Sequence, residues 1–390
     1  MDSTPSLLSL PTEVQLQIAT HLVGDGKRRS KHDGKNHCPV QDLLNTALTC
    51  QQLALVGREA LCSAPVLQSS KADVLISFLS KYPNLTKKIK CLTIETKETR
   101  KDKAYPVHIA HLDLDVLKYC KRHVRRLPIR KYVQDSMIAS LKAHRFEDHS
   151  VLLGLLLTML PQLTRLYLGG SILLNFPLFR SMMPNEPEDT DWRKPDWAAG
   201  PDQTWILPLI GPQLTHLELP IDLRRSAEAN IWTPLSIRNL PYSFPRLQWL
   251  SIPHMAATEI TQTHAEDVVP RSLHTLILTD ARCTCFGAFS RGLVPDEPSP
   301  SPPIFPHLRR IELYYRYPSP GTDPSVIAKL ARADIAVSEY IPACCLRSGD
   351  EFYHPWKYTA GEIGALEESR HEAYATEWDR AALQCDSEDE

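Results

Sequence analysis

The chain has 390 residues, of which 43% are hydrophobic and 23% are charged, and these fractions exclude wholesale disorder. Its formal charge of −2 excludes, at the level of the whole chain, the strong positive field of a protein that binds nucleic acid or a membrane surface. Proline is the unusual residue, with 32 prolines against 15 glycines. At about 8% of the chain, where about 5% is average, it predicts many short elements separated by stiff turns.

The sequence has no pattern typical of a secreted or membrane-anchored protein. The first residues do not combine a basic stretch with a long apolar segment. The longest apolar run, residues 151–160, is about half as long as a membrane-spanning helix needs to be. Ten cysteines in such a chain indicate reduced thiols. We therefore expect a protein of the cytoplasm, the nucleus or both, with no membrane partner.

Three amphipathic stretches open the chain. The first carries Val14, Ile18 and Leu22 at a spacing of four, which predicts a helix with one apolar stripe behind Leu10 and Pro11. Residues 41–50 and 53–61 predict two further short helices. Helices of this size carry more apolar surface than they can bury among themselves. We expect a partner protein, or the rest of the chain, to cover part of it.

These stretches resemble an F-box in the order and spacing of their residues. The match runs from Leu8-x-Leu10-Pro11-x-Glu13-Val14 through Ile18 and Leu22 to residues 42–44 and 48–53. The resemblance implies a three-helix module that docks onto the Skp-type adaptor of SCF ubiquitin ligases, and through it onto a cullin. It implies that eight residues face the adaptor or the core of the module: Leu10, Pro11, Val14, Ile18, Leu22, Leu43, Leu44 and Leu48. The alternative is a helical cap at the amino end with no docking role.

One segment departs from the F-box pattern. Residues 23–41 form a basic insert where the family has only a few residues between the first two helices. Its glycines and lysines indicate a flexible, solvated loop, and a nuclear localisation signal is the alternative.

A short pattern recurs between residues 80 and 315. It consists of Pro-x-Leu followed by aliphatic residues three and five positions after the leucine, and its four full copies begin at Pro161, Pro212, Pro245 and Pro306. Chance predicts about 0.4 such matches, so the repeat is real. A variant copy begins at Pro270 with one extra residue, and fainter copies begin at Ile89 and Val124. The aliphatic pair predicts a short strand with one face on a core.

The segments between the copies predict helices at residues 73–82, 112–120 and 151–160. Strand, helix and strand in repetition predict a solenoid that resembles leucine-rich repeats, although the gaps between copies are mostly longer than the 20–29 residues of regular repeats. We therefore expect an α/β fold, in which a small three-helix F-box module precedes an irregular solenoid similar to leucine-rich repeats. The expected domains are residues 1–66, 67–345 and 346–390, the last a charged helix with an acidic tail.

Two inserts interrupt the repeats. Residues 184–204 are polar and predict a loop, and residues 294–306 contain a run rich in proline that favours an extended conformation. The proline-rich run is either a stiff spacer or a ligand for an SH3- or WW-type domain.

The sequence contains no complete catalytic, phosphate-binding or metal-binding motif. His216-Leu217-Glu218 matches the start of the zinc deaminase signature, but the cysteine motif that should follow is missing. The pairs Cys283/Cys285 and Cys344/Cys345 lack the spacing of a metal site. We expect no enzymatic activity, no cofactor and no metal.

The strand residues that alternate with the aliphatic pair are candidates for binding a partner, because successive side chains of a strand point to opposite faces of a sheet. Tyrosine, tryptophan and arginine, which anchor many protein interfaces, are frequent among them. They are Arg165, Tyr167, His216, Glu218, Trp249, Ser251, Thr275, Ile277, Arg310 and Glu312, followed by Tyr314 and Tyr315. A solvated sheet face without a ligand is the alternative.

These features lead to one functional hypothesis and two alternatives. The leading one is a substrate receptor of an SCF-type ubiquitin ligase, whose partners are the adaptor, a cullin and an unknown target protein, without nucleic acid. The first alternative is an interaction scaffold that uses the same modules without ubiquitylation. The second is an enzyme whose active site is assembled from residues far apart in the sequence.

Overall fold

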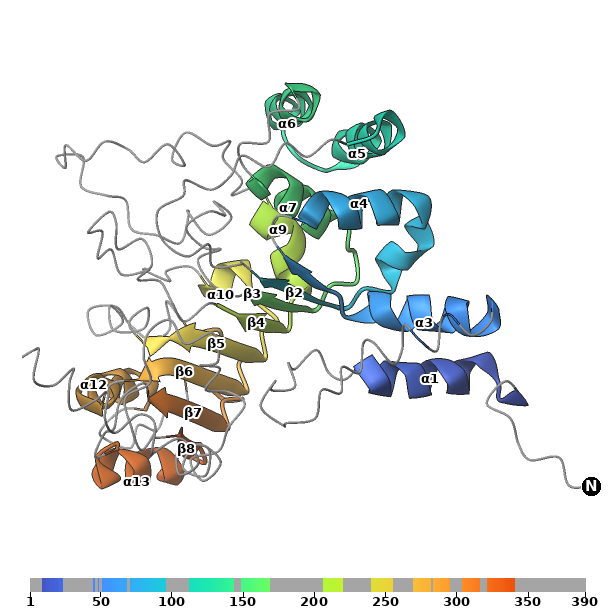
Figure 1. Ribbon diagram of the computed structural model, residues 1–390. Helices are drawn as coiled ribbons and strands as arrows, with labels where there is room; N and C mark the ends of the chain where they lie inside the picture. The colour runs from blue at the N-terminus through green and yellow to red at the C-terminus, as the bar shows by residue number, and fades with distance from the viewer. Residues whose placement is uncertain are drawn as a thin grey trace, which may run out of the picture.

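A computed structural model describes the folded parts of the chain (Figure 1). The described residues are 9–23, 45, 48, 51–68, 71–95, 112–143, 149–168, 206–219, 240–254, 269–281, 283–294, 304–315 and 321–340. Several predictions lie outside them: those for Leu43 and Leu44, for the insert at 24–41, for the loop at 184–204, for the proline-rich run at 295–303 and for the domain at 346–390.

The fold is mixed α/β and is organised by one open sheet of eight parallel strands. The strands lie side by side in the order of the sequence, from β1 at one edge to β8 at the other. They are β1 (Val66–Gln68), β2 (Cys91–Glu95), β3 (Arg165–Leu168), β4 (His216–Glu218), β5 (Trp249–Pro253), β6 (Thr275–Ala281), β7 (Arg310–Tyr315) and β8 (Ala336–Tyr340).

The described helices precede the sheet or lie between its strands. Before β1 come α1 (Thr12–Val23) and α3 (Gln51–Ser63), which pack side by side. Between strands lie α4 (Ala72–Lys81), the 3-10 helix η3 (Pro83–Lys87), α5 (Leu114–Arg126), α6 (Lys131–Ala143), α7 (His149–Thr158), α9 (Leu207–Ile210), the 3-10 helix η7 (Gly211–Gln213), α10 (Leu240–Ser243), α12 (Cys283–Leu293) and α13 (Pro324–Arg332).

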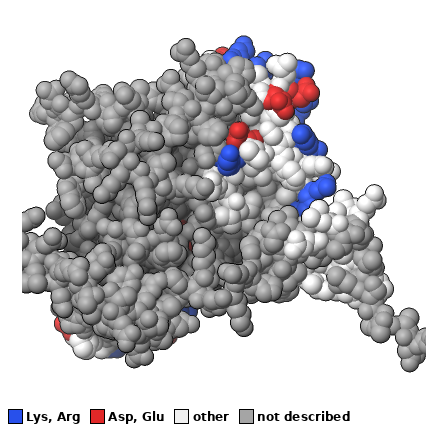
Figure 2. Space-filling model, in the orientation of Figure 1, with Lys and Arg blue, Asp and Glu red and all other residues white. Residues whose placement is uncertain are grey.

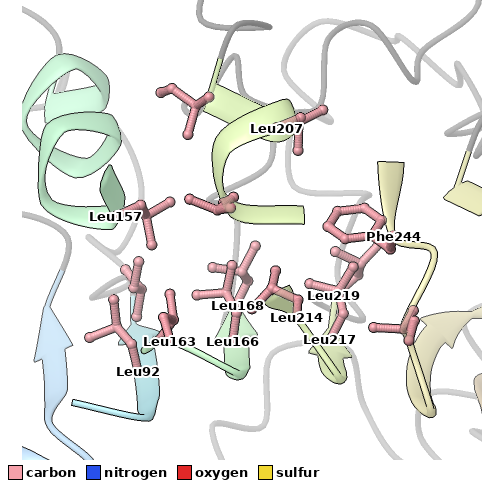
Figure 3. Close-up of a cluster of buried hydrophobic side chains, with 14 of the residues drawn as sticks. Leu92, Leu157, Leu163, Leu166, Leu168, Leu207, Leu214, Leu217, Leu219 and Phe244 are labelled. Carbon is pink, nitrogen blue, oxygen red and sulfur yellow. The ribbon is translucent and has the colours of Figure 1, made fainter. Parts of the chain in front are cut away.

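The strand order determines where the connecting segments lie. Because all eight strands are parallel and every connection moves one strand in the same direction, right-handed crossovers all fall on one face of the sheet. Figure 3 shows Leu92, Leu166 and Leu217 from β2, β3 and β4 pointing toward Leu157 of α7 and Leu207 of α9. One face of the sheet is therefore the core face, and among the described elements the other face carries no crossover helix.

A ladder of aliphatic side chains forms the centre of the core. In the sheet register, six residues on neighbouring strands lie directly opposite one another, and all are fully buried: Leu92, Leu166, Leu217, Leu250, Leu276 and Ile311. Their near-identical side chains explain the repeat, since each strand must fill the same layer. Truncation of such a leucine to alanine typically costs about 2–5 kcal/mol.

The proline of each full repeat occupies the second position of a four-residue turn. In the copy from Pro161, the N–H of Leu163 donates to the carbonyl of Leu160 over 3.2 Å, and the same bond recurs in the copies from Pro212, Pro245 and Pro306. Proline suits this position because its fixed φ matches the turn and its missing N–H is not needed there. Each turn delivers its leucine into the core at the start of a strand.

The variant copy uses the same turn with proline in another position. Here the N–H of Leu273 donates to the carbonyl of Pro270 over 3.0 Å, so proline is the first residue of the turn. The extra residue in the sequence pattern is thereby accounted for.

The structure confirms most of the predicted elements between the repeats and overturns one. Helices α4, α5 and α7 occupy the three segments predicted to be helical, and the faint copy at Ile89 is strand β2. The predicted strand after Val124 is wrong, because Val124 and Cys120 are buried residues of α5. Leu127 and Ile129 follow in a turn around Pro128, which has no N–H to give to a sheet.

The repeat pattern did not predict two of the strands, β1 and β8. At β1, Pro65-x-Leu67 is not followed by the aliphatic pair of the full pattern, and β8 has no proline directly before it. With these strands included, equivalent positions from Val66 to Ser338 follow one another at intervals of 27, 74, 51, 33, 26, 35 and 26 residues. Repeat units of very different length therefore share one strand register, and the longest carries α5, α6 and α7.

Two further sequence expectations concern thiols and membranes. Cys62, Cys91 and Cys120 are buried and form no disulfide bond. Burial raises the pKa of Cys62 to about 11 and that of Cys120 to about 12, so both stay protonated. Within the ranges that the structure describes, no helix combines the length and apolarity needed to cross a membrane.

Gly211 lies where the backbones of two repeat units approach each other closely. A Cβ atom at this position would lie 2.0 Å from the backbone carbonyl oxygen of Ser243. We predict that Gly211→Ala lowers the free energy of unfolding by about 1–3 kcal/mol or more, because backbone must move to admit the methyl group. Gly287→Ala in α12 is the matched control, since its nearest contact is Val326 Cγ2 at 3.9 Å. Urea unfolding of both variants checks the prediction; an equal effect would contradict it.

His123 joins α5 to α7 and makes stability depend on pH. Its Nε2 lies 3.1 Å from Thr158 Oγ1, and that hydroxyl donates to the carbonyl of Leu155, so the imidazole is the donor. Burial is the largest effect and lowers the pKa of His123 below its ordinary value of 6.5; a hydrogen bond with Thr158 opposes it only in part, and Arg126 lowers the pKa further. The neutral ring is thus favoured in the folded state.

We predict that the stability contributed by neutral His123 is complete above pH 6.5 and falls as the pH drops from there toward the lowered pKa. One proton sets an upper limit of about 1.4 kcal/mol per pH unit. The variant His123→Gln keeps a donor but does not titrate. Urea unfolding at pH 7.5 and 5.5 should show a smaller loss of stability for this variant than for the unchanged protein. Equal losses would exclude His123 as the titrating group.

Candidate functional site

The face of the sheet opposite the core carries nearly all of the predicted binding residues in aligned rows. The first row runs across five strands and consists of Arg165, His216, Trp249, Thr275 and Arg310. The second row consists of Tyr167, Glu218, Ser251, Ile277 and Glu312. Tyr314 lies beyond them, between Thr279 and Tyr340. Tyr315 does not belong to this face, because it alternates with Tyr314 and is part of the core.

Exposure decreases across this face from the amino ends of the strands toward their carboxyl ends. In the first row Arg310 is exposed, and the other four side chains are half-exposed. In the second row Tyr167 is half-exposed, whereas Glu218 and Glu312 are each 8% exposed and Ser251 is fully buried. Tyr314 is 3% exposed. The first row and Tyr167 are therefore the part of the face that a partner can reach directly.

An aromatic cluster lies at the centre of the accessible part. The Trp249 ring is 6.0 Å from the Tyr167 ring in an edge-to-face arrangement and 6.0 Å from the His216 ring in a stacked one. His216 Nδ1 also lies 2.9 Å from Thr215 Oγ1, which holds the ring in place. Such a rigid cluster can bury a large apolar area on binding at little cost in side-chain entropy.

Two arginines flank the aromatic cluster. Arg165 and Arg310 stand in the same row, four strand spacings apart, which is about 19 Å. The side chain of Arg310 remains 51% exposed although it is paired with Glu312. The accessible part of the face thus combines a central aromatic anchor with cations on both sides.

A buried polar network lies on β7, at one end of this face. Arg310 Nε donates to Glu312 Oε1 over 2.8 Å, and the hydroxyl of Tyr314 donates to Glu312 Oε2 over 2.7 Å. Burial and the carboxylate of Glu312 raise the pKa of Tyr314, so the phenol stays protonated and continues to donate. The Tyr314 ring also stacks on Tyr340 at 4.2 Å. This arrangement fixes Arg310 at the end of its row.

Some residues of this face were missed by the sequence pattern. Tyr340 comes from β8, which lacks Pro-x-Leu, and Thr279 follows the positions that the pattern covers. The hydroxyls of Ser251 and Thr279 are buried and have no hydrogen-bond partner within the described ranges. In the turns before β6 and β7, His274 and His307 stack at 5.5 Å. No sequence signal could have identified these residues as neighbours, because their proximity depends on the strand register.

The predicted adaptor-binding residues lie mainly on and before α1. Leu10 is half-exposed, Pro11 is exposed, and Val14 and Ile18 are 37% and 40% exposed. Leu48 is 84% exposed. Leu22 lies within α1, but its side chain is outside the described residues.

The contact between α1 and α3 uses a different stripe of α1. Ala19 packs against Val56 and Ala60 of α3, and all three are buried. Gln15, one turn before Ala19, is 2% exposed, and its amide donates to the carbonyl of Leu10 over 2.8 Å. The stripe of Val14 and Ile18 is therefore separate from the stripe that α3 covers.

Side-chain contacts attach α3 firmly to the first repeat unit. The Arg58 guanidinium lies over the Tyr82 ring at 4.5 Å, and Glu59 pairs with Lys88 at 2.6 Å. In addition, the N–H of Lys90 donates to the carbonyl of Ser63 over 3.2 Å. The α1–α3 pair is thereby held at a set position relative to the sheet.

Within the part of the chain that the structure describes, no group of three or more histidine, cysteine or acidic side chains could hold a metal ion. His216 and Glu218, the residues of the deaminase-like triplet, are neighbours on one face of β4.

No protein-family model matches the chain, and no match is found among curated proteins.

We predict that Tyr314→Phe destabilises the protein by about 1–3 kcal/mol, because it removes a donor from the buried Glu312 carboxylate. The matched control is Tyr242→Phe, which removes the same hydroxyl from a side chain that is 82% exposed and should have almost no effect. Denaturant unfolding at pH 7.5 measures both changes. A cost for Tyr314→Phe no greater than for the control would show that the network does not stabilise this end of the sheet.

Proposed function

We propose that the chain is the substrate-recognition subunit of an SCF-type cullin ubiquitin ligase. In this proposal the α1–α3 module, together with the segment between its helices, docks onto a Skp-type adaptor. The accessible part of the sheet face binds the target protein. The resemblance of the first 53 residues to an F-box supports the first half of the proposal.

The observation that carries the proposal is the exposure of Val14 and Ile18. Two β-branched side chains one turn apart on a short helix form an apolar stripe, and both keep more than a third of their surface exposed although α3 packs beside them. Leu10 and Pro11 extend the stripe at the start of α1. These are positions that the F-box resemblance assigns to adaptor contacts.

The arrangement of the sheet supports the receptor half of the proposal. Eight consecutive parallel strands with one crossover each are the arrangement expected for leucine-rich repeats, and three of the seven intervals fall within the roughly 20–29 residues of regular repeats. Repeat proteins of this kind bind partners through the face that carries no helices. Here that face presents Trp249, Tyr167 and two arginines.

Such a receptor would act by proximity and would perform no covalent chemistry of its own. It would raise the effective concentration of the target protein near the ubiquitin-charged enzyme carried by the cullin. The attachment of α3 through Arg58 and Glu59 supports this role, because a target can be positioned only if the docking module and the sheet keep a constant relative orientation.

We predict that the double variant Val14→Asp/Ile18→Asp reduces recovery of a purified Skp-type adaptor in a pull-down at least tenfold, because two charges would have to be buried at the interface. Val74→Asp on α4 is the control, since Val74 is apolar and 56% exposed but lies outside the module. Adaptor recovery that is undiminished in the double variant would refute the docking surface.

The same pull-down from cell extract separates the proposal from the scaffold alternative. Recovery of a cullin together with the adaptor is the expected result for a ligase subunit. Recovery of the adaptor without a cullin would favour an interaction scaffold that works without ubiquitylation.

A further inference from the structure

Helix α5 concentrates positive charge in a chain that is slightly acidic. The α5–α6 hairpin, residues 112–143, contains eight lysines and arginines against three aspartates, a formal charge of +5. The whole chain has a charge of −2, so all other residues together carry −7. Figure 2 shows several lysine and arginine side chains, with acidic side chains among them, at the upper right, in the region where Figure 1 places this hairpin.

Five cations of α5 share one side of the helix, which we call the α5 cationic face. It consists of Lys118, Lys121, Arg122, Arg125 and Arg126. The buried residues of α5, from Val116 to Val124, occupy the opposite side. At 1.5 Å per residue, the five cations fall within about 12 Å along the helix axis. All are exposed except Lys121, which is half-exposed.

Most of this charge is not compensated by other described residues. Lys118 pairs with Asp115 over 3.1 Å, and Lys131 of α6 pairs with Asp135 over 2.9 Å. Lys121, Arg122, Arg125 and Arg126 have no acidic partner in the described part of the chain. The Asp115–Lys118 pair lies at one end of the face, so the remaining four cations are adjacent.

The cationic face weakens the helix that carries it. Three pairs of cations stand four residues apart, Lys118 with Arg122, Lys121 with Arg125 and Arg122 with Arg126, and each such pair costs about 0.2–0.5 kcal/mol. The helix dipole favours Arg125 and Arg126 in the last turn, but it does not favour the three cations before them. A binding partner of opposite charge would relieve this repulsion.

We propose that the α5 cationic face binds an acidic segment of a partner protein. The five cations, within about 12 Å along the helix axis, match about four extended residues, or a helical stripe of about eight, rich in aspartate and glutamate. The proposal is independent of the ubiquitin-ligase function, because it uses neither α1 nor the sheet face.

Charge and burial argue against two other anionic partners. A membrane surface requires a helix whose apolar side is free to enter the lipid, but Val116, Leu117, Cys120 and Val124 of α5 are buried in the core. A long nucleic acid would extend beyond the hairpin and meet a chain that carries −7 elsewhere. A short acidic segment contacts the cationic face alone.

The test measures binding of a fluorescein-labelled peptide of eight glutamates to the full chain by fluorescence anisotropy. We expect binding at 50 mM salt that weakens at 200 mM salt, and no binding of a peptide of eight glutamines. The double variant Arg122→Glu/Arg125→Glu should weaken binding at least tenfold. The control Arg246→Glu/Arg332→Glu, which changes the net charge equally at exposed sites in the turn before β5 and in α13, should weaken it less than threefold.

A second variant controls for the possibility that the charge-reversed variant fails to fold. Arg122→Gln/Arg125→Gln should also weaken binding several-fold without lowering the Tm, because it removes repulsion within α5. Equal binding by the unchanged protein and both α5 variants would overturn the proposal. Tighter binding of an oligonucleotide of eight thymidines than of the glutamate peptide would also overturn it and assign the face to nucleic acid.

Discussion

A line of main-chain hydrogen bonds that crosses the sheet at the amino ends of the strands is the constraint on which the other features depend. The carbonyl of Lys90 accepts the N–H groups of Thr164 and Arg165 at 2.9 and 3.0 Å. The carbonyl of Thr164 accepts the corresponding pair from the next unit, and the pattern continues to Ala336. Six carbonyls form the line: Lys90, Thr164, Thr215, Gln248, His274 and Arg309. Because a slip by one residue would turn every side chain to the opposite face, this line determines what each face presents.

The line also explains why repeat units of such different length can coexist. Only the turn and the strand must match between neighbours, whereas the return path to the next turn needs only to cover the leucine ladder. Between β5 and β6 the return path is short, and between β2 and β3 it includes α5, α6 and α7. The cationic helix α5 is thus a product of an enlarged unit whose strands keep the common register.

Three surfaces with different chemistry result from this arrangement. The stripe of Val14 and Ile18 is apolar, the row around Trp249 combines aromatic rings with cations, and the α5 cationic face is almost purely electrostatic. They lie on different elements, so each can be altered without disturbing the others. The attachment of α3 to Tyr82 and Lys88, which flank η3, keeps the first two surfaces in a constant relation.

The sequence predicted those parts of the fold that repeat locally. Four prolines two positions before a leucine predicted four strands, because a turn followed by a buried aliphatic pair is a local signal. The same reasoning failed after Val124, where a helix is followed by a turn around Pro128. It also missed β1 and β8, which lack the full pattern of proline, leucine and aliphatic pair. For the binding surface, alternation along the strands predicted which residues share the face, but not that Glu218, Ser251, Glu312 and Tyr314 are buried.

By itself, the sequence determined the α/β character of the chain, the positions of the repeat turns, the identity of the leucine ladder and the amphipathic stripe of the first helix. These follow from composition and from spacings of two to five residues, over which local geometry decides. Only the tertiary structure decided the single sheet of eight strands in sequence order, the depth of burial along its free face and the contact of Trp249 with Tyr167 and His216. These depend on which strands pair and in which register, and that choice is made by hydrogen bonds between residues 26 to 74 positions apart.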